Sequence, residues 1–91
     1  MTAQAERIRA ALDRHGAERF VAKLLERAPR VTWDELAEPL RRWPHVVYRR
    51  HEVWALLHGT LGLGFAELGR VFGVDHTTVM NGVAKRVARL A

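Results

Sequence analysis

The side chains best suited to molecular recognition in this chain lie near its C-terminal end, in the string DHTTVMNGVAK that begins at Asp75. Asn can bond adenine through two hydrogen bonds, Thr offers a hydroxyl or a methyl group, and Lys suits guanine or phosphate. These are the chemistries needed to read base-pair edges in a nucleic-acid groove. The candidate residues of this string are Asp75, His76, Thr77, Thr78, Asn81 and Lys85.

The string is predicted to form an amphipathic helix over about His76 to Leu90. The expected buried stripe consists of Val79, Val83, Val87 and Leu90. At 100° per residue, Thr77, Asn81 and Lys85 then lie on the opposite face, and Thr78 flanks them. His76 lies in the first turn, where side chains project past the helix end. An ordinary amphipathic helix with a polar outer face is the alternative.

The residues before this helix predict a helix-turn-helix. A helix over about Phe65 to Phe72 is followed by only three residues before the next helix begins. Gly69 permits close approach of the following helix, and Gly73 can adopt the positive φ that turns the chain. Asp75 occupies the N-cap position, where its carboxylate can accept an amide hydrogen bond. The pattern therefore predicts a rigid pair of helices that presents the second one.

The net charge of +5 comes entirely from the second half of the chain. Residues 1–40 hold seven Arg or Lys and seven Asp or Glu, whereas residues 41–91 hold eight bases and three acids. Such asymmetry favours a polyanionic partner on one side of the fold. A solvated surface with surplus arginine is the alternative.

Part of this charge lies in the segment RRWPHVVYRRH, residues 41–51. Pro44 is expected to hold residues 41–45 out of helical conformation, as an ordered loop, and the next helix is expected over about Arg49 to Leu61. His51 is expected to contact phosphate or to cap that helix. The candidate DNA-binding residues of this segment are Arg41, Arg42, Arg49, Arg50 and His51.

The chain is predicted to be a small all-α domain of five to six helices, Trp-repressor-like in its C-terminal helix-turn-helix. One helix is expected from a Thr2 cap to about Arg14 and a second over about 17–27, with one bent helix as the alternative, and a third from a capping box at Thr32 through Leu40. Residues 1–30 are expected to be an N-terminal extension that packs on or extends the core formed by residues 31–91. A surface for a protein partner or for self-association is the alternative role of residues 1–30.

Two strings of this sequence resemble a known family. The string GFAELG, followed by FGVDHTTV, resembles the C-terminal DNA-binding domain of the bacterial replication initiator DnaA, whose recognition helix opens with the same DHTTV. The similarity extends upstream through VTWDELAEPLRR and VVYRRHEVWALL. It covers about Val31 to Leu90 and does not include an ATPase module.

The resemblance implies that Asp75, His76, Thr77 and Thr78 line the major groove of duplex DNA. It also implies that an arginine of the basic loop enters the adjacent minor groove. Arg42 matches that arginine best and Arg41 is the second choice, while Arg50 matches the arginine at the end of the loop. The family usually has FGGRDHTTV, so the turn here is one residue shorter and lacks an arginine. We therefore expect a preferred DNA site that differs from the family's.

Other function classes find little support in the composition. The chain has no Cys and no Ser, and no GxxxxGK[ST] string, so we expect no covalent catalysis, nucleotide or cofactor. His51, Glu52 and His58 lack the spacing of a metal site, and we expect no metal. No apolar run approaches the length of a membrane span. We expect a cytoplasmic, nucleoid-associated protein that regulates replication or transcription, with a protein-interaction module as the alternative.

Overall fold

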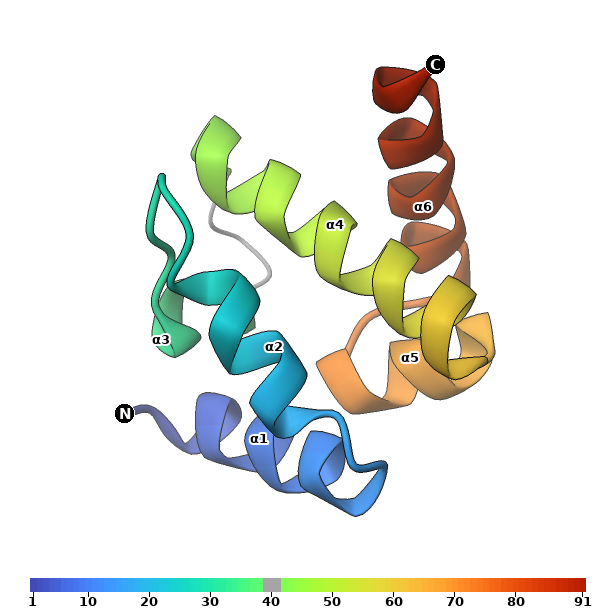
Figure 1. Cartoon of the computed structure of the whole chain (residues 1–91). Coiled ribbons are helices and arrows are strands. Elements are labelled where there is room, and N and C mark those ends of the chain that lie inside the picture. Colours follow the sequence, from blue (N-terminus) through green and yellow to red (C-terminus); the bar gives the residue numbers. More distant parts are fainter. Residues whose placement is uncertain (39–41) are drawn as a thin grey trace.

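The computed structural model describes residues 1–38 and 42–91, and in these residues the chain is all-helical with no strand. The prediction of a small all-α domain is confirmed. Figure 1 shows α4 crossing the middle of the molecule, with α1 to α3 on one side and α6 on the other. The helices of the described residues are α1 (Ala3–Arg14), α2 (Glu18–Leu25), α3 (Trp33–Ala37), α4 (Pro44–Leu61), α5 (Phe65–Phe72) and α6 (His76–Leu90).

The first two helices are separate, not one bent helix. The Thr2 side chain caps α1 by accepting a hydrogen bond from the amide of Ala5, and Gly16 turns the chain with a φ of 70°. Helix α2 ends at Leu25, two residues earlier than expected. The amides of Glu26 and Arg27 bond the carbonyls three residues before them, which tightens the last turn and ends the α-helix.

Helix α3 opens with the predicted capping box. The Thr32 hydroxyl accepts from the amide of Glu35 at 3.1 Å, and the Glu35 carboxylate accepts from the amide of Thr32 at 2.9 Å. The helix ends at Ala37, whereas the sequence predicted it through Leu40. Glu38 is extended, with a ψ of 104°, because the residue before a proline disfavours the helical conformation. Leu40 itself lies outside the described residues.

Helix α4 begins five residues earlier than the sequence predicted. Pro44 is its first residue, where its fixed φ suits a helix and its missing N–H is not needed. The expectation that Pro44 and His45 belong to a non-helical loop is therefore wrong. Of the expected basic loop, only Arg42 and Trp43 are described and non-helical, and Arg41 lies outside the described residues.

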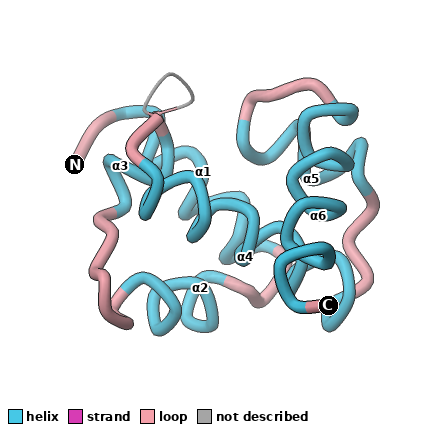
Figure 2. The backbone as a smooth tube through the Cα atoms, turned by 90° about the horizontal axis from the view of Figure 1, so that it is seen from above, coloured by secondary structure: helices cyan, strands magenta, loops and turns pink. Residues whose placement is uncertain are grey.

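The core is shared by the N-terminal helices and the rest of the chain. Trp54 and Leu57 of α4 are fully buried in the same cluster as Ile8 and Leu12 of α1 and Val21 of α2. Seen from above, α1 to α3 and the α5–α6 pair lie on opposite sides of the molecule, with α4 reaching between them (Figure 2). Within residues 1–38 and 42–91, no helix combines the length and the apolar character required to cross a membrane.

Helices α5 and α6 meet through a turn of the predicted form. A Cβ atom at Gly69 would lie 2.7 Å from the Val74 carbonyl oxygen, so only glycine permits this close approach. Gly73 has the expected positive φ, at 71°. The predicted buried stripe of α6 is only half right. Val79 is buried and Val83 partly so, but Val87 and Leu90 are 59% and 68% exposed. The final turns of α6 extend beyond the core, as Figure 1 shows, so their apolar residues remain largely exposed.

Candidate nucleic-acid interface

The N-terminus of α6 is fixed by Asp75. Its carboxylate accepts hydrogen bonds from the Thr77 amide at 2.8 Å and the Thr77 hydroxyl at 2.6 Å. These two hydrogen bonds lower the pKa of Asp75 below its usual value, and the bond from the Thr77 hydroxyl has the larger effect. His76 lies beside it, with Nδ1 3.4 Å from the same carboxylate. The first turn of α6 thus presents an ordered set of polar groups at an exposed helix end.

The outer face of α6 carries Thr78, Asn81 and Lys85, all exposed. Together with Arg42 and Arg50 they line a hollow of about 240 Å³ between α4 and α6. Hydroxyl, amide and cationic groups from two helices therefore converge on one surface. The structure brings together six of the sequence-predicted residues around this hollow: Arg42, Arg50, His51, Thr78, Asn81 and Lys85.

Gly82 determines how closely α6 approaches α4. A Cβ atom at Gly82 would lie 2.6 Å from Cε3 of Trp54 and 2.8 Å from Cδ2 of His51. The helix therefore rests directly on these two rings. Sequence reasoning did not single out Gly82. The signal that could have found it is a glycine in the interior of a predicted helix, a position that usually has a packing reason.

His51 lies in the middle of α4, so it does not cap the start of that helix as one of its two expected roles required. The pKa of His51 is lowered to about 4 by burial and by the nearby cations Arg89, Lys85 and Arg50. The imidazole is therefore neutral at pH 7 and can accept a hydrogen bond. Its Nδ1 lies 3.2 Å from a guanidinium nitrogen of Arg89.

Arg50 has a structural contact in addition to its place at the hollow. Its guanidinium donates to the carbonyl oxygens of Leu36 at 3.3 Å and Glu38 at 2.7 Å, at the end of α3. Burial is the main cause that lowers the pKa of Arg50, followed by the charge of Arg42. The Arg50 side chain therefore secures the end of α3 and also lines the hollow.

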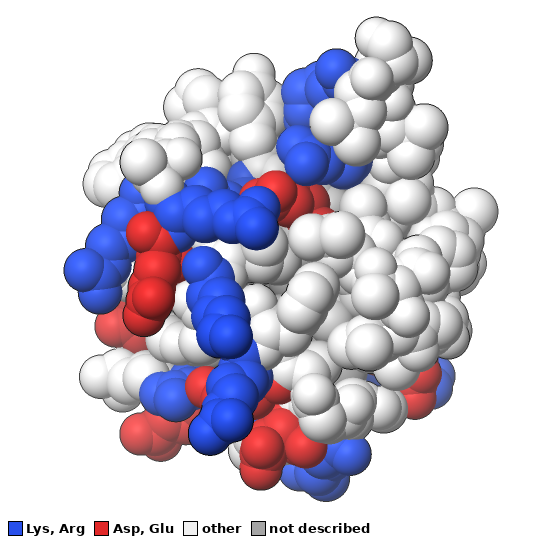
Figure 3. All heavy atoms as spheres, viewed as in Figure 1, with Lys and Arg blue, Asp and Glu red and all other residues white. Residues whose placement is uncertain are grey.

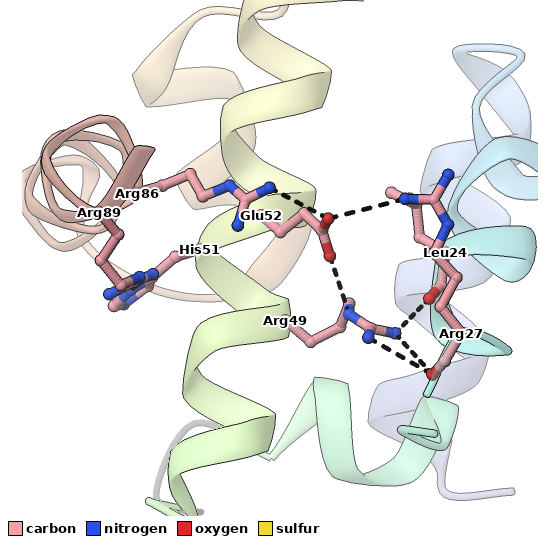
Figure 4. A network of polar contacts seen from close by, with 7 residues as sticks. All are labelled: Leu24, Arg27, Arg49, His51, Glu52, Arg86 and Arg89. Carbon is pink, nitrogen blue, oxygen red and sulfur yellow. Dashed lines mark hydrogen bonds and ion pairs between the residues drawn. The ribbon is translucent and has the colours of Figure 1, made fainter. Parts of the chain in front are cut away.

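Arg49 points away from the outer face of α6. Its Nε lies 2.9 Å from the Glu52 carboxylate, and its guanidinium donates to the carbonyl oxygens of Leu24 and Arg27 (Figure 4). The residue is buried, with 7% of its surface exposed. The structure thus separates Arg49 from the other predicted residues and gives it a role in packing α2 against α4.

Glu52 is the centre of a network that sequence reasoning missed. Besides Arg49, its carboxylate lies 3.3 Å from Arg86 of α6 and 3.9 Å from Arg27, which follows α2 (Figure 4). Glu52 and Arg86 are 34 positions apart, so no local spacing could reveal this pair. The network ties α6 to α4 and to the end of α2.

Charge is mixed over the N-terminal part of the molecule. On the face drawn in Figure 3, basic and acidic side chains alternate over α1 to α3, in keeping with the zero net charge of residues 1–40. Among the described residues, by contrast, no acidic side chain lines the hollow between α4 and α6. Trp43, beside Arg42, is 53% exposed and stacks on His45.

Comparison with known proteins adds no assignment to this site. No protein-family model, no curated protein and no solved structure matches the chain. Over the described ranges, no group of three His, Asp or Glu side chains is placed to hold a metal ion.

Proposed function

We propose that this protein binds duplex DNA in a sequence-dependent manner, with the N-terminal half of α6 in the major groove. Arg42 would reach the adjacent minor groove or the backbone. It would act by occupying its sites, as a regulator of replication or transcription. The string FGVDHTTV resembles the DnaA DNA-binding domain, in which the helix that opens with DHTTV is the recognition helix, and this resemblance supports placing the start of α6 in the major groove.

The observation that carries the proposal is the convergence of Thr78, Asn81 and Lys85 with Arg42 on one hollow that the described acidic residues do not reach. Phosphates neutralised by Arg and Lys supply most of the affinity in such interfaces, and base edges supply specificity. A helix that is rigidly seated on Trp54 can hold its side chains in a fixed register with the bases. The arrangement is therefore suited to both tasks.

A protein-interaction role for α1 and α2 has less support. Their apolar side chains, Ile8, Leu12, Val21 and Leu24, are buried in the common core. A partner that used them would have to displace α4 or α5. Their burial therefore favours a role in supporting the fold.

Selection of bound sites from random duplexes tests the proposal directly, because it both detects binding and reveals the preferred sequence. Affinity for the selected site should fall on the order of a thousandfold between 50 and 200 mM salt if about six phosphates are contacted. A response that is flat in salt, or equal affinity for heparin and for the selected duplex, contradicts the proposal.

Variants locate the reading surface. Asn81→Ala and His76→Ala should weaken binding to the selected site roughly 5- to 150-fold while changing affinity for random duplexes little. Met80→Ala is the matched control for Asn81→Ala, since Met80 is exposed on the same helix but, unlike Asn81, does not line the hollow. If neither variant alters the ratio of specific to random binding, α6 is not the reading helix.

A further inference from the structure

Arg89 is held in place near the end of α6, one turn beyond Lys85. Its guanidinium carbon lies 4.5 Å from the centre of the Tyr48 ring, and one of its nitrogens lies 3.2 Å from Nδ1 of His51. Tyr48 is 52% exposed, so the stack is at the surface. Two residues of α4 thus hold a cation that would otherwise move freely on a long side chain.

Among the described residues, the charged groups that lower the pKa of the His51 ring beside Arg89 are all cations. Lys85 and Arg50 lie near the same His51 ring and, with Arg89, oppose its protonation. Among the described residues, no carboxylate forms an ion pair with Arg89 or Lys85, and Glu52 is occupied by Arg27, Arg49 and Arg86. A cluster of like charges around a neutral ring is unfavourable by itself and favours an anion between them.

Arg89 also lies in line with the hollow. Thr78, Lys85 and Arg89 are spaced by seven and four residues, so they fall within about 40° of one another around α6. The three span about 16 Å along the helix axis at 1.5 Å per residue. The major groove of B-DNA is about 12 Å wide, so with Thr78 in the groove the far end of this row reaches the phosphates at its edge.

We propose that Arg89, positioned by Tyr48 and His51, binds a phosphodiester of the DNA backbone beyond the groove entered by the start of α6. This inference rests on the proposed function. His51 accepts one hydrogen bond from a guanidinium that has five N–H donors, and Arg89 is an exposed residue, so donors remain for a ligand. A planar fork matches two phosphate oxygens at once. Arg89 would therefore strengthen binding to any duplex without reading its sequence.

The test compares Arg89→Ala with Arg19→Ala, which removes the same charge from an exposed position of α2. Binding to the selected site and to a random duplex is measured from 50 to 300 mM salt. For Arg89→Ala, the slope of log K against log salt should become shallower by about 0.9, and both affinities should fall roughly 5- to 10-fold at 0.1 M salt. Arg19→Ala should leave the slope unchanged, and Arg89→Lys should largely restore it.

Three results would overturn the inference in distinguishable ways. If the wild-type protein shows no salt-dependent binding, the proposed function fails and this inference fails with it. If wild type and Arg89→Ala share one steep slope, only the phosphate contact fails. If Arg89→Ala instead lowers the melting temperature and changes the ratio of specific to random binding, Arg89 is a tie between α6 and α4 and not a DNA contact.

Tyr48→Leu examines the positioning separately. The variant keeps the charge of Arg89 but removes the ring beneath it. We expect weaker binding at an unchanged salt slope, because the cation must then be ordered on binding. An affinity equal to that of wild type would overturn the role of Tyr48 as a platform.

Discussion

Gly82→Ala offers the most direct test of how α6 is positioned. The new Cβ would lie 2.6 Å from Cε3 and 2.8 Å from Cζ3 of Trp54, and 2.8 Å from Cδ2 of His51. Ordinary carbon contacts lie at about 3.5–4.0 Å, so α6 must move away by about 1 Å or the indole must tilt. Trp54 is only 1% exposed and contacts Phe72 edge-on, which leaves the ring little room to yield.

The magnitude follows from two opposing effects. Forcing an extra methyl into a packed site costs about 1–3 kcal/mol, and a rigid buried ring places this case in the upper part of that range. Replacing Gly by Ala inside a helix returns up to about 1 kcal/mol. We therefore expect Gly82→Ala to lower the free energy of unfolding by about 1–2 kcal/mol and the melting temperature by about 5–15 °C.

The assay is urea and thermal unfolding followed by circular dichroism, with Gly59→Ala as control. Gly59 lies inside α4, and no neighbouring atom lies within 4 Å of the position that an added Cβ would take, so Gly59→Ala should be neutral or stabilising by up to about 1 kcal/mol. The displaced α6 should also lose discrimination between the selected and random duplexes. Equal stability of the two variants would refute the close approach as described.

Three further predictions concern charged and titrating residues. Glu52→Gln should lower the free energy of unfolding by about 1–3 kcal/mol, because Arg27, Arg49 and Arg86 lose their shared carboxylate. In a protein that already carries Arg86→Met, the same substitution should cost less, and an equal cost in both backgrounds would contradict the network. Asp75→Asn should lower the melting temperature at pH 7; since the folded pKa of Asp75 is depressed, this difference should fade as pH falls below about 4, and a difference constant from pH 7 to pH 2 would exclude the charged cap. Because the folded pKa of His51 is about 4, the unfolded chain binds more protons than the folded protein between about pH 6.5 and pH 4. The free energy of unfolding of the wild type should therefore decline as pH falls through that window, more than that of His51→Gln. Parallel curves of stability against pH for the two proteins would refute the depressed pKa.

Local patterns were sufficient to predict several elements. Thr2, Thr32 and Asp75 cap their helices as predicted, because a capping hydrogen bond spans only two or three residues. Gly73 turns the chain at the end of α5 for an equally local reason. The exposed polar face of α6 followed from helical periodicity alone. Pro44 shows the limit of such rules, since proline both interrupts a helix and starts one, and here it starts one.

Arginine roles could not be assigned from the sequence. Arg49 and Arg50 are neighbours in the basic segment, yet successive residues of a helix point about 100° apart. Arg49 therefore turns to Glu52 and α2, while Arg50 turns to α3 and the hollow. Arg89 was not a candidate in the sequence, because the position of its guanidinium depends on Tyr48 and His51, which lie 41 and 38 positions away.

By itself, the sequence determined the all-α class, the caps, the turn between α5 and α6 and the half of the chain that carries the net positive charge. These features depend on contacts within a few residues or on composition. Only the tertiary structure decided which cations face α6, that Gly82 seats this helix on Trp54, and that Val87 and Leu90 remain exposed. Such features depend on pairs of residues far apart in the chain, and a helical repeat fixes the direction of a side chain but not the neighbour it meets.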